Sequence, residues 1–272
     1  MTFHSILFEG PEDGKRQMIE APAFFRDLNL DKVVDAVTAG REEYDLKPYF
    51  YTPLTDIEAI AYRHEIMRDL ENEDVFQSIK LFSRQMSMMR QHLTGADKLY
   101  YKYQKERWFL DAVEVYCEAV AQLLHDLQQV GLNSRGLLAF REHLALYAES
   151  GRFTTLLKES KALKSALSAI RYCVIIRDGT VTVRHYDSEV DYSAVVEETF
   201  AKFKQGAVKD YRCEIAPSSG MNHIEAQVLD FVALLNPDVF RALDDFCTKN
   251  RDFLDKPIVT FDREVQFYLA YL

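Results

Sequence analysis

Residues 51–70 read YTPLTDIEAIAYRHEIMRDL, and they contain the clearest helix start in the chain. Thr55 and Glu58 have the spacing of a capping box, in which the hydroxyl and the carboxylate each accept a hydrogen bond from a free backbone N–H group. Pro53 favours an extended approach to this start, because proline cannot extend the helix backwards. Beyond the cap, apolar residues recur at helical spacing and predict one buried stripe, formed by Ile57, Ile60, Ala61, His64, Met67 and Leu70.

Helical patterns continue on both sides of this stretch, with few breaks. The 272 residues include only 10 glycines and 7 prolines, which favours long helices over a turn-rich β fold. The pattern of cap and apolar residues predicts four helices: 29–38, 72–94, 133–150 and 153–170. Asn29 caps the first, and Asn133 or Ser134 caps the third. Gly40, Gly95 and Gly151 end the first, second and third helix in turn. No glycine or proline interrupts 96–130, so this segment is one long helix or two that break near Lys105. Helices joined by short loops are typical of an antiparallel bundle.

The helical period ends at residues 172–185, which read YCVIIR-DG-TVTVRH. Two β-branched runs flank Asp178-Gly179, a dipeptide typical of a type I′ hairpin turn because both central residues need a positive φ. Beyond it we expect a helix at 192–204, a third short strand at 211–215, a break at 217–220, and helices from Asn222, Asn236 and Pro257. The predicted fold class is therefore mainly α: a multi-helix bundle with long lever-like helices and a small β-hairpin insertion.

Charge is distributed unevenly along the chain. The formal net charge is −10, yet residues 80–107 alone carry +5, which leaves about −15 for the remainder. Tyrosines and a tryptophan lie among the later cations of this segment, and a basic, aromatic strip suits a nucleic-acid backbone. The alternative is a solvated helix face that balances acidic neighbours. The candidate phosphate contacts here are Arg90, Lys98, Lys102 and Lys105.

The sequence contains no recognisable catalytic constellation. The segment 9–16, EGPEDGKR, departs from a phosphate-binding loop, because Glu9 occupies its first glycine position and Arg16 its hydroxyl position. The 4 cysteines and 7 histidines have no zinc-site spacing, and no apolar run reaches the roughly 18 residues of a membrane helix. We therefore expect a cytoplasmic chain with reduced cysteines, no membrane contact, and no catalytic, cofactor or metal residue of its own.

Part of the opening stretch also resembles a known family. Pro53-Leu54, Asp56, Ile60, Arg63-His64 and Leu70 are similar to the P-L-x-D-x-x-x-I-x-x-R-x-x-x-x-x-x-L segment that opens the helical core, or lever, domain of the MutS family of DNA mismatch-repair ATPases. The runs DLNLDKVVDAVTAG, DYSAVVEETFAKFKQGAVKDY and TFDREVQFYLAYL extend the resemblance over most of the chain, residues 1–17 being the least matched. Together they resemble a bacterial subgroup that lacks the mismatch-reading amino-terminal domain.

The resemblance implies a division of the chain into four parts. Residues 1–50 are an amino-terminal segment with the first helix, 51–170 the helical core, 171–216 a hairpin-containing clamp-like insertion, and 217–272 returning core helices. An ATPase domain that binds ATP and Mg²⁺ would follow Leu272, so we expect the amino-terminal piece of a longer protein. The resemblance implies that the dimer contacts of a full-length homodimer lie mostly in the ATPase domains, so we expect a monomer or weak dimer for this chain. In the clamp, Arg177 and Arg184 would contact DNA phosphates without reading sequence.

Two functions from different classes follow. The first is the non-catalytic core and clamp region of a MutS-like ATPase, which contacts DNA and relays ATP-driven changes. The family's Phe-x-Glu mismatch-reading motif has no room ahead of the core, so branched or nonspecific duplex DNA is the expected substrate. The second is a helical protein–protein interaction module with no nucleic-acid role. Salt dependence separates the two, because phosphate contacts weaken steeply with salt whereas apolar helix-face contacts respond little.

Overall fold

The computed structural model describes residues 3–10, 18–188, 190, 192–203 and 221–272, and this part of the chain is mainly α-helical. The helices are α1 (Phe24–Asp27), α2 (Leu30–Thr38), α3 (Lys47–Tyr51), α4 (Ile57–Leu70), α5 (Glu73–Lys98), α6 (Lys102–Gln129), α7 (Arg135–Glu149), α8 (Gly151–Ala169), α9 (Tyr192–Phe203), α10 (His223–Leu235), α11 (Pro237–Lys249) and α12 (Lys256–Leu269). The strands are β1 (Tyr172–Arg177) and β2 (Thr180–His185), which form one antiparallel hairpin. The predicted fold class is therefore confirmed.

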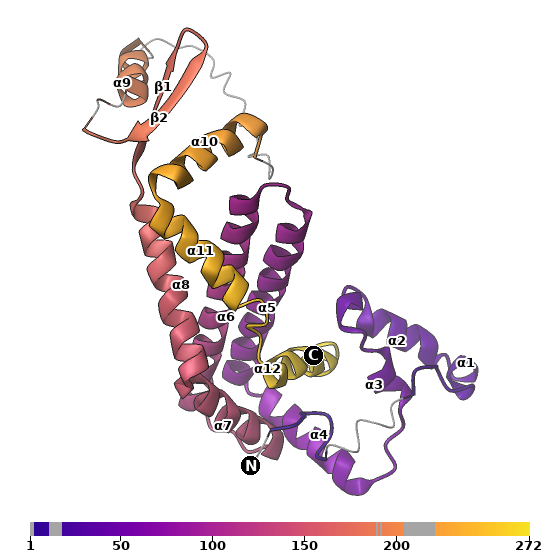
Figure 1. Ribbon diagram of the computed structural model, residues 1–272. Helices are drawn as coiled ribbons and strands as arrows, with labels where there is room; N and C mark the ends of the chain where they lie inside the picture. Colours follow the sequence, from indigo (N-terminus) through magenta and orange to yellow (C-terminus); the bar gives the residue numbers. More distant parts are fainter. Residues whose placement is uncertain (1–2, 11–17, 189, 191, 204–220) are drawn as a thin grey trace.

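The long helices run side by side and carry the hairpin at one end of the molecule (Figure 1). Helices α5 and α6 form an antiparallel pair, and α6, with 28 residues, is about 40 Å long. Helix α8 packs on α6 and leads to the hairpin. Helix α10 then contacts β2, and α11 returns the chain along α8 and α6. Helix α12 then lies against α5. No helix in the described ranges combines the length and the apolar character that crossing a membrane requires.

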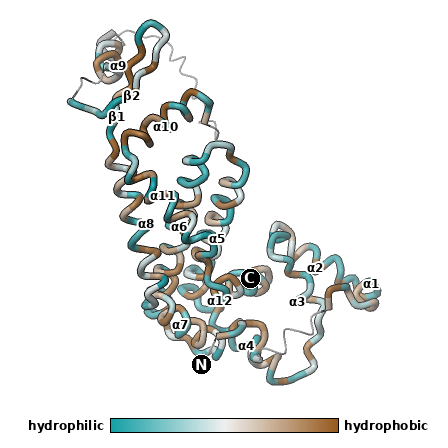
Figure 2. The backbone as a smooth tube through the Cα atoms, viewed as in Figure 1, coloured by the Kyte–Doolittle hydropathy of each residue, from teal (hydrophilic) through white to brown (hydrophobic). Residues whose placement is uncertain are grey.

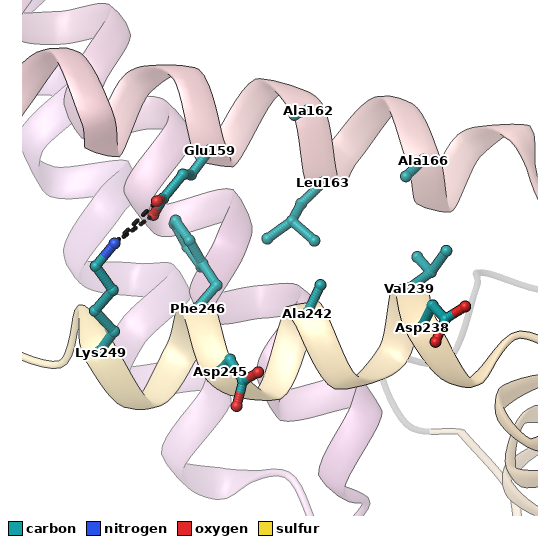
Figure 3. A pocket seen from close by; sticks show the side chains of 10 residues that line it. All are labelled: Glu159, Ala162, Leu163, Ala166, Asp238, Val239, Ala242, Asp245, Phe246 and Lys249. Carbon is teal, nitrogen blue, oxygen red and sulfur yellow. Dashed lines mark hydrogen bonds and ion pairs between the residues drawn. The ribbon is translucent and has the colours of Figure 1, made fainter.

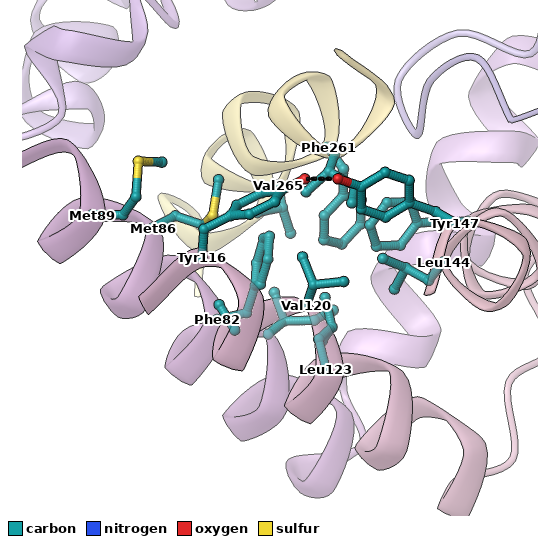
Figure 4. Close-up of a cluster of buried hydrophobic side chains, with 14 of the residues drawn as sticks. Phe82, Met86, Met89, Tyr116, Val120, Leu123, Leu144, Tyr147, Phe261 and Val265 are labelled. Atoms are coloured by element: carbon teal, nitrogen blue, oxygen red, sulfur yellow. Dashed lines mark hydrogen bonds between the residues drawn. The ribbon is translucent and has the colours of Figure 1, made fainter. Parts of the chain in front are cut away.

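The core lies where α5, α6, α7 and α12 meet (Figure 4). Phe140 of α7 stacks on Phe261 of α12, with ring centroids 3.6 Å apart. Tyr116 of α6 donates a hydrogen bond to the hydroxyl of Tyr147 at 3.1 Å, so the buried hydroxyls have partners. Apolar residues at helical spacing predict a buried stripe on α5 and on α7, and the structure buries all but one of them: Val75, Ile79, Phe82, Met86 and Met89 on α5, and Leu137, Phe140, Leu144 and Tyr147 on α7. Leu93, the last residue of the α5 stripe, is half-buried.

Helix α4 begins where predicted, but its cap and its buried face differ from the prediction. Asp56, and not Thr55, caps the helix, because its side chain accepts a hydrogen bond from the Glu58 backbone N–H at 3.3 Å. The predicted stripe is confirmed only in part: Leu70 is buried and Ile60, Ala61 and Met67 are half-buried. Ile57 is 79% exposed, and His64 is exposed rather than a core histidine. The residues of α4 that are buried are Tyr62, Arg63, Ile66, Asp69 and Leu70.

Two charged residues of this face are buried, and each forms hydrogen bonds with backbone groups. The Arg63 side chain donates to the Leu7 carbonyl oxygen at 3.1 Å. The Asp69 carboxylate accepts hydrogen bonds from the backbone N–H groups of Asn133 at 3.0 Å and Ser134 at 2.8 Å. A stripe read from apolar residues alone therefore misses the true orientation of α4.

A glycine and a tryptophan pack together at the end of the α5–α6 pair. Gly95 lies inside α5, so the prediction that it stops the helix is wrong. A Cβ atom at this position would lie 2.2 Å from Cζ3 of Trp108, so the missing side chain makes room for the indole. The break in segment 96–130 falls at Leu99–Tyr101 and not near Lys105.

Other predicted helix boundaries have mixed outcomes. Ser134 caps α7 by accepting from Leu137 N–H, and Gly40, with a φ of +76°, follows α2 as predicted. Asn29 makes no side-chain cap, since its own φ is 56°, so the predicted cap is wrong. Gly151 opens α8 instead of ending the preceding helix.

The amino-terminal segment is held by a buried carboxylate of α12. Glu264 accepts hydrogen bonds from the Ser5 hydroxyl at 2.7 Å and from the Ile6 backbone N–H at 2.8 Å. Tyr268 donates to the Ile6 carbonyl oxygen at 2.7 Å. Burial raises the pKa of Glu264 to about 7. These hydrogen bonds join segment 3–8 to α12, although the two lie near opposite ends of the sequence.

Candidate nucleic-acid interface

The hairpin forms as its sequence predicts. Asp178 and Gly179 both have positive φ, 49° and 75°, as a type I′ turn requires. Cys173 pairs with Arg184, and Arg177 pairs with Thr180. The expected strand at 211–215 and the break at 217–220 lie outside the described residues.

The two candidate arginines of the hairpin share one face. Side chains alternate between the faces of a strand, so Arg177 and Arg184 point to the same side. Thr180 and Thr182 share this face, as do the half-buried Cys173 and Ile175 between the two arginines. The two arginines and the two threonines are the polar residues of this face. All four residues are exposed. Arg184 lies opposite Cys173, four residues from Arg177, so the two positions are about 13 Å apart along the ribbon. Hydroxyl and guanidinium groups are the donors that proteins use on nucleic-acid phosphates.

The other face of the hairpin is largely apolar, and one of its residues contacts the helices. Val183 packs against a small buried cluster of Val232, Ala233 and Phe240, which belong to α10 and α11. Tyr103 of α6 joins the cluster, with its ring 4.8 Å from that of Phe240. Hydrophobic residues are dense on α10 and on the hairpin (Figure 2). The arginine-bearing face is therefore held at the ends of α6 and α8.

The three candidate lysines lie near the turn between α5 and α6. Lys98 and Lys105 are exposed, and neither forms an ion pair within the described part of the chain. Lys102 differs, because it lies 3.0 Å from a carboxylate oxygen of Asp244 and 3.6 Å from one of Glu106. The hydrogen bond to Asp244 raises the pKa of Lys102, and burial raises the pKa of Glu106 to about 7. Lys102 therefore joins α6 to α11.

Arg90 interacts with residues of the chain itself. It forms ion pairs with Asp262 of α12 and, at 3.2 Å, with Glu43. Its guanidinium also lies over the ring of Tyr44, 4.7 Å from the centroid. These contacts join α5 to α12 and to the segment before α3. Because they occupy the guanidinium, we leave Arg90 out of the proposed interface.

Sequence reasoning missed two features of this end of the molecule. Thr180 and Thr182 share the arginine face, and the two-residue alternation of a strand could have shown this. Asp244 neutralises Lys102 from far along the chain, and no sequence signal joins the two.

Comparisons with known proteins add no relative. No family model, no curated protein and no solved structure matches the chain. Within the described ranges, no group of three or more His, Cys, Asp or Glu side chains could hold a metal ion. The functional argument therefore depends on the geometry of this chain and on the sequence resemblance described above.

Proposed function

We propose that this chain is the DNA-contacting core and clamp region of a MutS-like ATPase. In this proposal the hairpin contacts the phosphates of duplex or branched DNA, and the long helices relay changes from an ATPase domain that binds ATP and Mg²⁺. The chain itself contributes no catalytic residue. The full-length protein would act in the cytoplasm as a homodimer.

The path of the chain is the observation that carries this proposal. The chain leaves the bundle at the end of α8, forms the hairpin and α9, and returns through α10 and α11 along the same helices (Figure 1). The hairpin is thus an insertion at the end of long helices, which is the arrangement that the resemblance to MutS proteins implies. A hairpin in that place, with two exposed arginines on one face, suits contact with a phosphate backbone.

Contacts of α12 with α5 support the relay. Gln266 of α12 donates to the Ser83 hydroxyl at 2.6 Å, and Asp262 pairs with Arg90. A displacement of α12 would therefore act on α5, whose other end lies at the turn that bears Lys98 and Lys102. Rigid helices with such fixed contacts can transmit movement between distant sites.

Salt dependence tests the proposal. Four phosphate contacts, from Arg177, Arg184, Lys98 and Lys105, would lower DNA affinity about 100-fold between about 50 and 200 mM salt. The assay is fluorescence anisotropy of labelled duplex and four-way branched DNA across that range. Steep weakening is expected for both DNAs. No binding at low salt, or binding that salt leaves unchanged, would contradict the proposal.

The alternative is a helical protein–protein interaction module with no nucleic-acid role. Exposed apolar side chains of α10 favour it: Ile224, Phe231 and Leu234 are 54%, 50% and 74% exposed. Such a surface binds by apolar burial, so this alternative predicts no DNA binding in the same titration.

A further inference from the structure

An open groove of about 580 Å³ lies between α8 and α11 (Figure 3). Leu163 and Phe246 form its floor, and both side chains belong to the buried core. Alanines and a valine form its walls: Ala162 and Ala166 on α8, and Val239 and Ala242 on α11. The groove is therefore apolar, and its volume is in the usual range of a ligand site.

Small side chains keep the groove open. Ala162 and Ala242 are exposed, and each offers only a methyl group to the space between the helices. Larger side chains at these two positions would cover apolar surface and stabilise the packing of α8 on α11. The space between the two helices therefore remains open.

The rim of the groove is acidic. Asp238 and Asp245 of α11 line it, and neither forms an ion pair within the described part of the chain. At one end Lys249 bonds Glu159 of α8 at 2.9 and 3.1 Å, so these two charges neutralise each other and close that end. Arg241 lies on the same helix but outside the lining residues. The two aspartates therefore leave an uncompensated negative edge beside an apolar floor.

We propose that this groove binds an amphipathic helix of another protein, with apolar side chains on its inner face and Lys or Arg on its flanks. A helix in a groove presents anchors at i, i+3, i+4 and i+7, which fits a channel between two helices. The basic flanks would pair with Asp238 and Asp245. A second copy of the chain is the poorer occupant, because each copy carries a net charge of −10.

Occupation of the groove would fix α8 relative to α11. These helices carry the chain to the hairpin and back, so the bound helix would hold the support of the hairpin in one arrangement. The inference does not depend on DNA binding, because none of the groove residues is a proposed phosphate contact.

The test uses two labelled peptides of about five helical turns each. One carries leucines at i, i+3, i+4 and i+7 with lysines on both flanks, and the other has glutamates in place of the lysines. Fluorescence anisotropy with the whole chain should show at least tenfold tighter binding of the lysine peptide. Ala242→Trp, which fills the groove, should weaken that binding at least tenfold. Ser165→Trp places the same ring on α8 outside the groove and should have no effect.

Charge reversal supplies the second arm. The double variant Asp238→Lys and Asp245→Lys should bind the glutamate peptide more tightly than the lysine peptide. Glu71→Lys with Glu118→Lys reverses two exposed charges elsewhere and should keep the original preference. The proposal is overturned if wild type binds neither peptide, if Ala242→Trp binds like wild type, or if the preference survives reversal of the two aspartates. A dimer that Ala242→Trp dissociates would assign the groove to a second copy and overturn it too.

Discussion

The contact between Gly95 and Trp108 predicts an unusual effect of a small substitution. Gly95→Ala adds one methyl group inside α5, at a point where its Cβ would lie 2.2 Å from Cζ3 and 2.7 Å from Cε3 of Trp108. These distances are far shorter than any carbon–carbon contact, so the indole must move. His92 lies near the indole, with ring centroids 5.5 Å apart, and restricts that movement.

Two opposing terms set the size of the effect. Alanine inside a helix is normally favoured over glycine by about 1 kcal/mol. Inserting a methyl group into a packed site costs about 1–3 kcal/mol. Because the clash is with a stiff aromatic ring, we expect the cost of the added methyl group to exceed the gain in helix propensity. Gly95→Ala should therefore lower the free energy of unfolding by about 1 kcal/mol.

Urea unfolding followed by far-UV circular dichroism measures this change. Trp108 is the only tryptophan, so its fluorescence reports on the same contact in the single variant. Gly151→Ala is the matched control, since no atom lies within 4 Å of its added Cβ, and it should not be destabilised. Adding Trp108→Leu to Gly95→Ala should remove the clash and reverse the sign of the glycine effect. The packing argument is refuted if Gly95→Ala alone stabilises the chain as an ordinary helix position would.

Two further predictions concern buried polar groups. Tyr116→Phe removes the hydroxyl that bonds the Asp255 backbone N–H and the Tyr147 hydroxyl. Urea unfolding should show that the free energy of unfolding falls by about 1–3 kcal/mol. Tyr100→Phe is the control and should not change it, because the Tyr100 side chain is 88% exposed. Burial raises the pKa of Glu264 from 4.5 to about 7, so the folded chain keeps a proton that the unfolded chain releases, and stability falls as the pH rises through that window. Urea unfolding should show that the free energy of unfolding of wild type is lower at about pH 7.5 than at about pH 5. In Glu264→Gln this difference should be smaller, by up to about 3 kcal/mol. The same difference in both proteins would contradict the raised pKa of Glu264.

Features that depend on local physics could be predicted from the sequence. Asp178-Gly179 defines its turn because the positive φ values belong to the two residues themselves. The stripes of α5 and α7 could be predicted because strictly apolar positions recur along each helix. The hairpin arginines share a face for the same local reason, since the turn fixes the register.

Features that depend on distant partners could not be predicted. Arg63 and Asp69 are buried because backbone groups of the amino-terminal segment and of the loop before α7 meet them. The sequence pattern predicts a helix stop at Gly95, whereas the structure shows that its missing side chain makes room for Trp108. Arg90 looks like a free cation in the sequence, yet Asp262, 172 residues away, pairs with it. Each of these depends on the tertiary arrangement of the helices.

The most direct test of the proposed function is the DNA affinity of the double variant Arg177→Ala and Arg184→Ala. Fluorescence anisotropy with labelled duplex DNA, at several salt concentrations from about 50 to 200 mM, gives both the affinity and its salt slope. Each lost phosphate contact lowers the slope by about 0.9, so we predict weaker binding and a slope smaller by about 1.8. Arg26→Ala with Arg68→Ala removes two exposed arginines elsewhere and should leave both quantities unchanged. If the hairpin variant binds DNA with the affinity and slope of wild type, the hairpin is not the DNA contact.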